Sequence, residues 1–249
     1  MFKSLILTVL LVFAFPVIAI VNIDKINVGD DDQTHQGEIS LDVSGASGNT
    51  DTQATSLGGR FQWNNQSTQF IVLKYDYAKS SGIKNTDKTF LHYRYINNAK
   101  DTSTWESFFQ LQDDEFKLLK LRTLIGAGYR LRLSTSNKES QSRIGAGLFY
   151  SREEQEDAFL TVEELIRANI YFTYHLKVNK AVNFLSTTYY QPDIENFSDY
   201  RALEQLSFEF KLSKDLLYFV SIDIAYDNKP VNGLEKDDTS YKSGITYRF

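Results

Sequence analysis

Apolar and polar side chains alternate along most of this chain, from Gly37 to its last residue. Successive side chains of an extended chain point to opposite sides, so this period of two predicts β-strands with one apolar face. Twelve alternating stretches can be separated, and they cover residues 37–44, 52–63, 68–78, 88–97, 104–112, 117–133, 140–151, 163–176, 181–191, 200–212, 216–227 and 240–249.

The final stretch, SYKSGITYRF, carries its apolar residues on one side of the predicted strand: Tyr241, Ile245, Tyr247 and Phe249. Soluble domains more often finish in a frayed, solvated tail. A barrel, in contrast, needs a regular last strand that pairs with the first, because lipid leaves an open sheet edge unsatisfied. We interpret Tyr241, Tyr247 and Phe249 as the terminal signal that bacterial barrel-assembly machinery reads.

The connections between the stretches alternate in length. Compact turns such as NNQS and KVNK follow the even-numbered stretches, whereas longer or more charged loops such as SSGIKNTD, DDEFK and REEQEDAFLT follow the odd-numbered ones. An even number of strands, with short turns at one end and long loops at the other, is typical of an up-and-down outer-membrane barrel.

A soluble sandwich is the main structural alternative, because a half-buried sheet alternates in the same way. Strand length decides against it, since soluble strands usually have about 5–6 residues, whereas these stretches match the length that crosses a bilayer at a tilt. Trp63, Trp105 and Tyr150 lie near strand ends, where aromatic girdles occur. We therefore predict an all-β transmembrane up-and-down antiparallel β-barrel of about twelve strands, with ten or fourteen as the alternatives.

The chain divides into three segments. Residues 1–19 combine Lys3, a short apolar run and a small-residue ending at Ala19, which is typical of a cleavable signal peptide. The run is too short for a spanning helix, which needs about 20 residues. We assign residues 20–36 as a flexible periplasmic leader and residues 37–249 as the barrel, which places the protein in the outer membrane of a bacterium.

Composition narrows the expected partners. The net charge of −5 is weak and mixed, which argues against a nucleic-acid partner. The chain has no Cys, so disulfides cannot stabilise it. The expected partners are outer-membrane lipids, lipopolysaccharide and, during biogenesis, the barrel-assembly machinery. Nothing in the sequence indicates an oligomeric state.

Charged residues recur on the polar faces of the predicted strands, and basic ones are the more frequent. The lumen-lining candidates are Arg60, Arg94, Arg122, Arg130, Arg132, Arg143, Arg167, Arg201 and Asp223. They could form a pore wall that favours anions, or they could fill the lumen with cross-strand ion pairs. The second interpretation is favoured, because no long constriction loop is evident and a barrel of this size lies between filled and open types.

An outer-membrane surface hydrolase of the lipase or protease type is the alternative function. His92 and His175 both face inward by alternation, but neither stands in a Ser/His/acid pattern and no G-x-S-x-G occurs. The acidic loops lack the spacing of a calcium loop. We therefore predict no enzyme, no catalytic residue, no cofactor and no metal site. The G-x-G pairs at 126–128 and 145–147 lie inside strands, where we expect them to relieve crowding.

Four segments resemble a known family: SGNTDT at 47–52, LIGAGYRL at 124–131, YYQPDIENFSDYR at 189–201 and the stretch 226–249. In this order they are similar to the domain of unknown function 481 (DUF481) family, whose members are often labelled salt-induced outer membrane proteins. The resemblance implies an outer-membrane barrel and no settled biochemical role. Our expectation is a structural protein or a passive small-solute pore, linked to envelope or osmotic stress.

Overall fold

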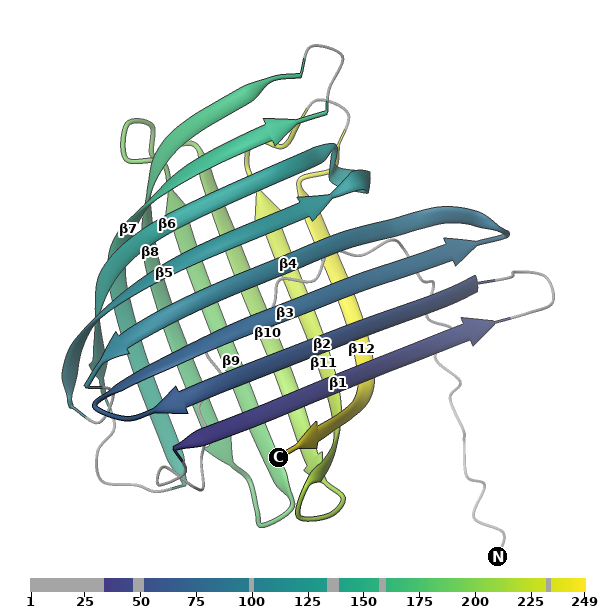
Figure 1. The fold of residues 1–249 in the computed structure, drawn as a ribbon. Helices are drawn as coiled ribbons and strands as arrows, with labels where there is room; N and C mark the ends of the chain where they lie inside the picture. The colour runs from purple at the N-terminus through teal and green to yellow at the C-terminus, as the bar shows by residue number, and fades with distance from the viewer. Residues whose placement is uncertain (1–33, 47–51, 99–100, 134–138, 157–159, 232–233) are drawn as a thin grey trace, which may run out of the picture.

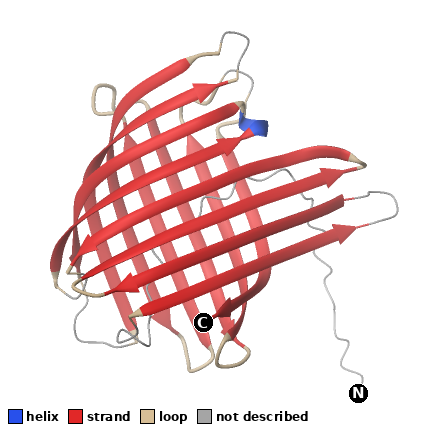
Figure 2. Ribbon diagram, viewed as in Figure 1, coloured by secondary structure: helices blue, strands red, loops and turns tan. Residues whose placement is uncertain are grey.

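The computed structural model describes residues 34–46, 52–98, 101–133, 139–156, 160–231 and 234–249. They form one closed β-barrel, in which every neighbouring pair of strands is antiparallel (Figures 1 and 2). The predicted signal peptide and most of the predicted leader lie outside the described residues.

Twelve strands follow one another around the barrel, and the last pairs with the first. Their bounds are β1 His35–Ala46, β2 Thr52–Asn64, β3 Ser67–Ser80, β4 Ile83–Asn97, β5 Ser103–Asp114, β6 Leu119–Arg132, β7 Ser140–Gln155, β8 Val162–Lys177, β9 Val182–Pro192, β10 Tyr200–Lys211, β11 Leu216–Asp227 and β12 Asp237–Arg248. A short 3-10 helix, η1, spans Glu115–Lys117 between β5 and β6. The predicted strand count and topology are confirmed.

The alternation in the sequence becomes the difference between the outside and the lumen. On β6, Ile125 and Tyr129 point outward and are 58% and 64% exposed, whereas Leu124 and Arg130 point inward and are buried. The other strands repeat this arrangement, so large apolar side chains cover the outside of the barrel. An apolar outer surface with a polar interior suits a barrel in lipid.

The two ends of the barrel differ, and we call them the turn end and the loop end. The turn end carries the connection between β2 and β3, and the loop end carries η1 and the segments that follow β3, β7, β9 and β11. No helix within the described residues is long and apolar enough to cross a membrane.

The prediction that SSGIKNTD, residues 80–87, forms a long loop is wrong. β3 runs to Ser80 and β4 starts at Ile83, so only Ser81 and Gly82 connect them. Both have positive φ angles, 51° and 76°, as the two-residue turn of a tight hairpin requires. Lys84 to Asp87 are half-buried on both faces. Without one apolar face this part of the strand does not alternate, and periodicity could not detect it.

Other strands also extend beyond their predicted bounds. β7 continues four residues past position 151, to Gln155, and β12 begins at Asp237. β1 begins at His35, two residues before the position predicted for the start of the barrel. The predicted loop DDEFK is divided between the end of β5 and η1. Leu118 then reverses the chain with a φ of 54°, and its N–H bonds back to the Glu115 carbonyl.

Candidate functional site

The structure places the nine lumen-lining candidates on the inner side of the barrel. Arg60, Arg94, Arg130, Arg167 and Asp223 are buried, and four more are half-buried: Arg122, Arg132, Arg143 and Arg201. Their part in solute passage stays a prediction.

A cavity of about 370 Å³ occupies the loop-end half of the lumen. β4, β5 and η1 form one side of it, and β10, β11 and the segment after β11 form the opposite side. Its inner wall is aromatic, with Phe90, Phe108, Phe149 and Tyr189, and the amides of Gln110, Gln112, Asn169 and Gln191 lie among these rings. The arrangement suits a small solute that combines apolar surface with hydrogen-bonding groups.

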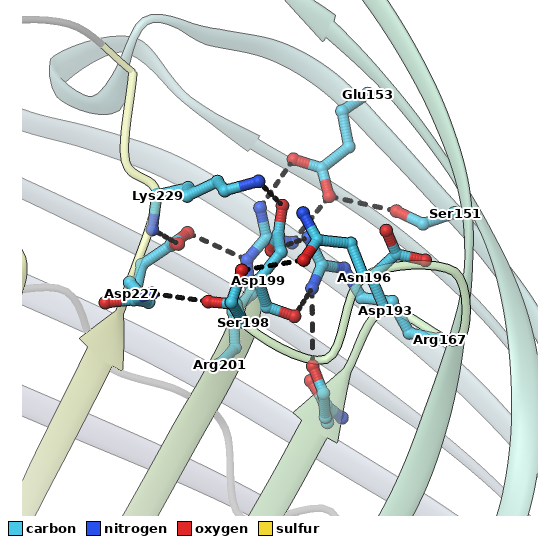
Figure 3. A network of polar contacts seen from close by, with 12 residues as sticks. Ser151, Glu153, Arg167, Asp193, Asn196, Ser198, Asp199, Arg201, Asp227 and Lys229 are labelled. Atoms are coloured by element: carbon cyan, nitrogen blue, oxygen red, sulfur yellow. Dashed lines mark hydrogen bonds and ion pairs between the residues drawn. The ribbon is translucent and has the colours of Figure 1, made fainter.

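Glu153 of β7 is the centre of an ion network on the cavity wall (Figure 3). One carboxylate oxygen accepts a bond from Arg122 Nη2 at 2.8 Å, and the other accepts from Arg201 Nη1 at 2.6 Å. Ser151 Oγ donates a further bond at 2.9 Å. Arg201 also donates from Nε to Asp227 at 2.8 Å, so the network joins β6, β7, β10 and β11.

A second group of charges fixes the segment between β9 and β10. Arg167 of β8 donates to Asp199 at 2.8 Å, and Lys229 lies 3.5 Å from the other oxygen of the same carboxylate. Arg167 also donates to the Gln191 carbonyl at 3.3 Å. Figure 3 shows this group beside the Glu153 network, so both lie at the loop end of the lumen.

Glu106 of β5 gathers contacts from three other strands deeper in the lumen. Arg94 of β4 and Arg130 of β6 each lie 3.4 Å from Glu106 Oε2. Tyr171 donates its hydroxyl to Oε1 at 2.6 Å. Tyr171 belongs to β8, and its ring lies over Gly145 of the neighbouring strand β7. Glu106 and Tyr171 are each 2% exposed, so this contact is buried along the wall between β5 and β8.

His92 lies in an aromatic stack on the cavity wall. Its ring is stacked on Phe90, Phe108 and Phe70, with ring centroids 5.6–6.2 Å apart. Its Nδ1 lies 3.1 Å from Gln110 Oε1. His175 is near the turn-end terminus of β8, opposite Gln141 and Leu185. The two histidines therefore do not share a site.

The basic residues of the cavity wall have acidic partners. Each of the six described basic side chains that line the cavity has a carboxylate oxygen within 3.6 Å. The six pairs are Lys88–Asp76, Arg94–Glu106, Lys117–Asp238, Arg122–Glu153, Arg201–Asp227 and Lys229–Asp199. This pairing weakens the field that unpaired basic side chains would produce, although Asp76 and Glu106 are each shared with further basic residues.

Lys117 and Asp238 connect opposite sides of the loop end. Lys117 is part of η1, Asp238 is near the start of β12, and their charged atoms lie 2.9 Å apart. Burial lowers the pKa of the Lys117 ammonium, and the charge of Asp238 opposes that shift. The ion pair holds η1 against the first residues of β12.

A smaller cavity of about 120 Å³ lies beside β1, β2, β3 and β10–β12. Lys242 of β12 donates to Asp76 of β3 at 2.8 Å across this part of the lumen. The Arg60 guanidinium stacks on Phe70 at 3.8 Å. Asp223 accepts bonds from Gln205 and Ser240.

The remaining predicted residues lie at the turn end or on the outer surface. Arg132 and Arg143 are direct cross-strand neighbours on β6 and β7. Tyr241, Tyr247 and Phe249 all point outward and are more than half exposed. The backbones of Phe249 and Gly37 exchange two hydrogen bonds, which close the barrel. The assembly-signal role of Tyr241, Tyr247 and Phe249 stays a prediction.

Within the residues that the structure describes, no group of three or more His, Cys, Asp or Glu side chains could hold a metal ion. Part of the acidic loop charge is paired, since Glu115 contacts Lys84 and Glu154 contacts Arg152.

Sequence reasoning missed the aromatic filling of the lumen, for which glycines were the available signal. A Cβ on Gly126 would lie 2.5 Å from the Phe108 ring and 2.7 Å from Phe149. A Cβ on Gly145 would overlap the Tyr171 ring. These glycines therefore make room for inward aromatic rings, which is more specific than the general relief of crowding that we expected.

A closed barrel with an apolar outer surface and a lumen of paired charges is a transmembrane up-and-down β-barrel of the outer-membrane type. The family model for "Protein of unknown function, DUF481" matches residues 39–249. The chain belongs to the DUF481 family.

Two solved structures are similar in fold. The NanC porin aligns with 85% of this chain and 98% of its own, at 11% identity and a TM-score of 0.55. The translocator domain of the autotransporter NalP from Neisseria meningitidis aligns with 88% of this chain and 90% of its own, at 13% identity and a TM-score of 0.52. At these identities the likeness is one of fold alone. No curated protein matches the sequence.

Proposed function

We propose that this protein lies in a bacterial outer membrane and provides a passive path for small solutes, which enter through the loop-end cavity. The carrying observation is a 370 Å³ cavity inside a closed barrel, lined by aromatic rings and amides. The fold likeness to the NanC porin supports the same class of function. Passive exchange of small solutes would also fit the role in osmotic stress that the family label implies.

The path should discriminate little between anions and cations. The sequence raised the alternative of an anion-favouring wall, but each basic residue of the cavity has an acidic partner. A ring of unpaired charges selects ions by sign, whereas a ring of paired charges largely does not.

Conductance of the purified protein in planar bilayers tests the proposal. We expect discrete steps in KCl and a reversal potential near zero in a KCl gradient. Leu203→Trp places a large ring in the cavity that Leu203 lines, so the step size should fall. Leu206→Trp, on the outward face of the same strand, is the matched control and should conduct like the parent protein.

Two results would contradict the proposal. One is an absence of steps from protein that is folded and inserted in the bilayer, which would leave a structural role. The other is equal step sizes for Leu203→Trp and Leu206→Trp, which would mean that current does not pass through this cavity.

A further inference from the structure

The seam between β1 and β12 is paired over a much shorter length than the other seams of the barrel. Its ladder has four residue pairs, from Glu38–Arg248 to Leu41–Ile245. The next shortest described ladder, between β8 and β9, has eight pairs. Both strands continue past the short ladder, β1 to Ala46 and β12 back to Asp237. Figure 1 shows them together at the turn end and diverging towards the loop end.

The split part of this seam faces lipid. Val43 on β1 and Tyr241 on β12 point outward on either side of it and are 70% and 62% exposed. Leu41 and Ile245, the last pair of the ladder, are exposed apolar residues as well.

Beyond the ladder, β1 and β12 direct backbone N–H and C=O groups into the split, where no ladder pairs them. In an antiparallel pair, alternate residues turn both backbone groups to the same neighbour. Gly37 and Phe249 exchange two bonds, so the same alternation directs the backbone of Val43, Tyr241 and Ser243 into the split. Unpaired backbone groups in hydrocarbon cost several kcal/mol each. A polar group that enters the split would offset this cost.

A cavity that carries charged side chains from both strands lies directly inside the split. The 120 Å³ cavity is lined by Ser40 and Asp42 from β1 and by Lys242 and Thr246 from β12. Asp42 Oδ1 is buried and has no hydrogen-bond partner within the described part of the chain. Lys242 donates to Asp76 at 2.8 Å, so its ammonium group already has an acceptor. The open acceptor at this site is therefore the Asp42 carboxylate.

We propose that the split seam is a lateral portal that takes an amphipathic molecule from the membrane. Its head group would be uncharged and would carry hydroxyl groups that donate to Asp42 and to the backbone carbonyls of the split, which have no ladder partner among the described residues. Its alkyl chain would stay in lipid, between Val43 and Tyr241. An anionic head group is disfavoured because acidic side chains outnumber basic ones in the lining of the cavity: Glu38, Asp42, Glu209 and Asp223 against Arg60, Lys74 and Lys242. This proposal goes beyond passive conduction and does not depend on it.

Disulfide trapping tests the split. Because the chain has no native cysteine, only the introduced cysteines can cross-link. Leu41→Cys with Ile245→Cys joins the last pair of the ladder. Val43→Cys with Ser243→Cys occupies the next outward-facing positions on the same strands. In membranes treated with an oxidant, we expect the first pair to cross-link and the second to stay reduced. Equal cross-linking of both pairs would show a fully closed seam and would overturn the portal.

Photolabelling in lipid nanodiscs tests the ligand. The probe is a monoacylglycerol with a diazirine in its acyl chain, and a diazirine fatty acid of equal length is the charged comparison. We expect the monoacylglycerol to label β1 and β12 at least about fivefold above β6, as one hydrogen bond of about 1 kcal/mol would give. Asp42→Leu should remove this enrichment, whereas Asp215→Leu, at an exposed turn-end position, should preserve it. Equal labelling of all strands by both probes would overturn the assignment. Conductance is a separate readout, so failure of either proposal would be recognised without the other.

Discussion

Single charged residues in this lumen act through partners that are distant in sequence. Glu153 binds Arg201, 48 positions away, and Asp76 binds Lys242, 166 positions away. Alternation along each strand indicates which side a residue faces, but it does not show which residues meet across the barrel. The sequence therefore indicated a surplus of basic residues, whereas the structure shows how carboxylates compensate them.

Glu153→Gln should convert the cavity wall into an anion-favouring one. The change removes the negative charge that Arg122 and Arg201 share. One unbalanced charge at ~4 Å is worth about 1 kcal/mol in water, so the anion-to-cation permeability ratio should rise at least about fivefold. Reversal potentials in a KCl gradient measure this ratio.

Glu154→Gln is the matched control for that variant. Glu154 is the next residue along β7 and pairs with Arg152 on the outer side of the barrel. The substitution therefore removes the same charge outside the lumen. An unchanged reversal potential in Glu153→Gln, with the barrel folded, would mean that this network does not line the conduction path.

At the scale of elements, glycines on β6 and β7 let aromatic side chains from other strands fill the lumen. Gly126 faces Phe108 and Phe149, and Gly145 faces Tyr171. Because the Tyr171 ring lies over Gly145 and its hydroxyl reaches Glu106, the fit at Gly145 helps to hold β8 to β5. Glycine weakens a strand locally, but at these two positions it makes room for packing between strands.

Gly145→Ala should destabilise the barrel by about 1–3 kcal/mol, since the new methyl group overpacks against the Tyr171 ring. Denaturant unfolding in detergent micelles measures the free energy. Gly59→Ala is the control, because the nearest atom to its added methyl is 3.7 Å away. Equal stability of the two variants would contradict the packing assigned to Tyr171.

Sequence periodicity predicted the strands where lipid lies on one side and the lumen on the other. It did not detect the first residues of β4, near Lys84, where both faces are half-buried and the strand does not alternate. It also could not show the short β1–β12 ladder. β1 and β12 each alternate by themselves, and only the spatial relation of the first strand to the last reveals that the seam divides.

At the scale of the whole molecule, the barrel is a cylinder with apolar side chains outside and paired charge inside. The fold class, the strand number and the family were all accessible from the pattern of the chain. The two cavities and their contents were not, because they arise where side chains from non-neighbouring strands meet.

Gel migration of the membrane-extracted protein before and after heating tests the closed barrel most directly. A barrel closed by the β1–β12 ladder resists detergent and migrates as a compact species until boiling unfolds it. We predict faster migration of the unheated sample and a shift to the position of the unfolded chain after boiling. Identical migration of the two samples, from protein extracted in mild detergent, would contradict a closed transmembrane barrel.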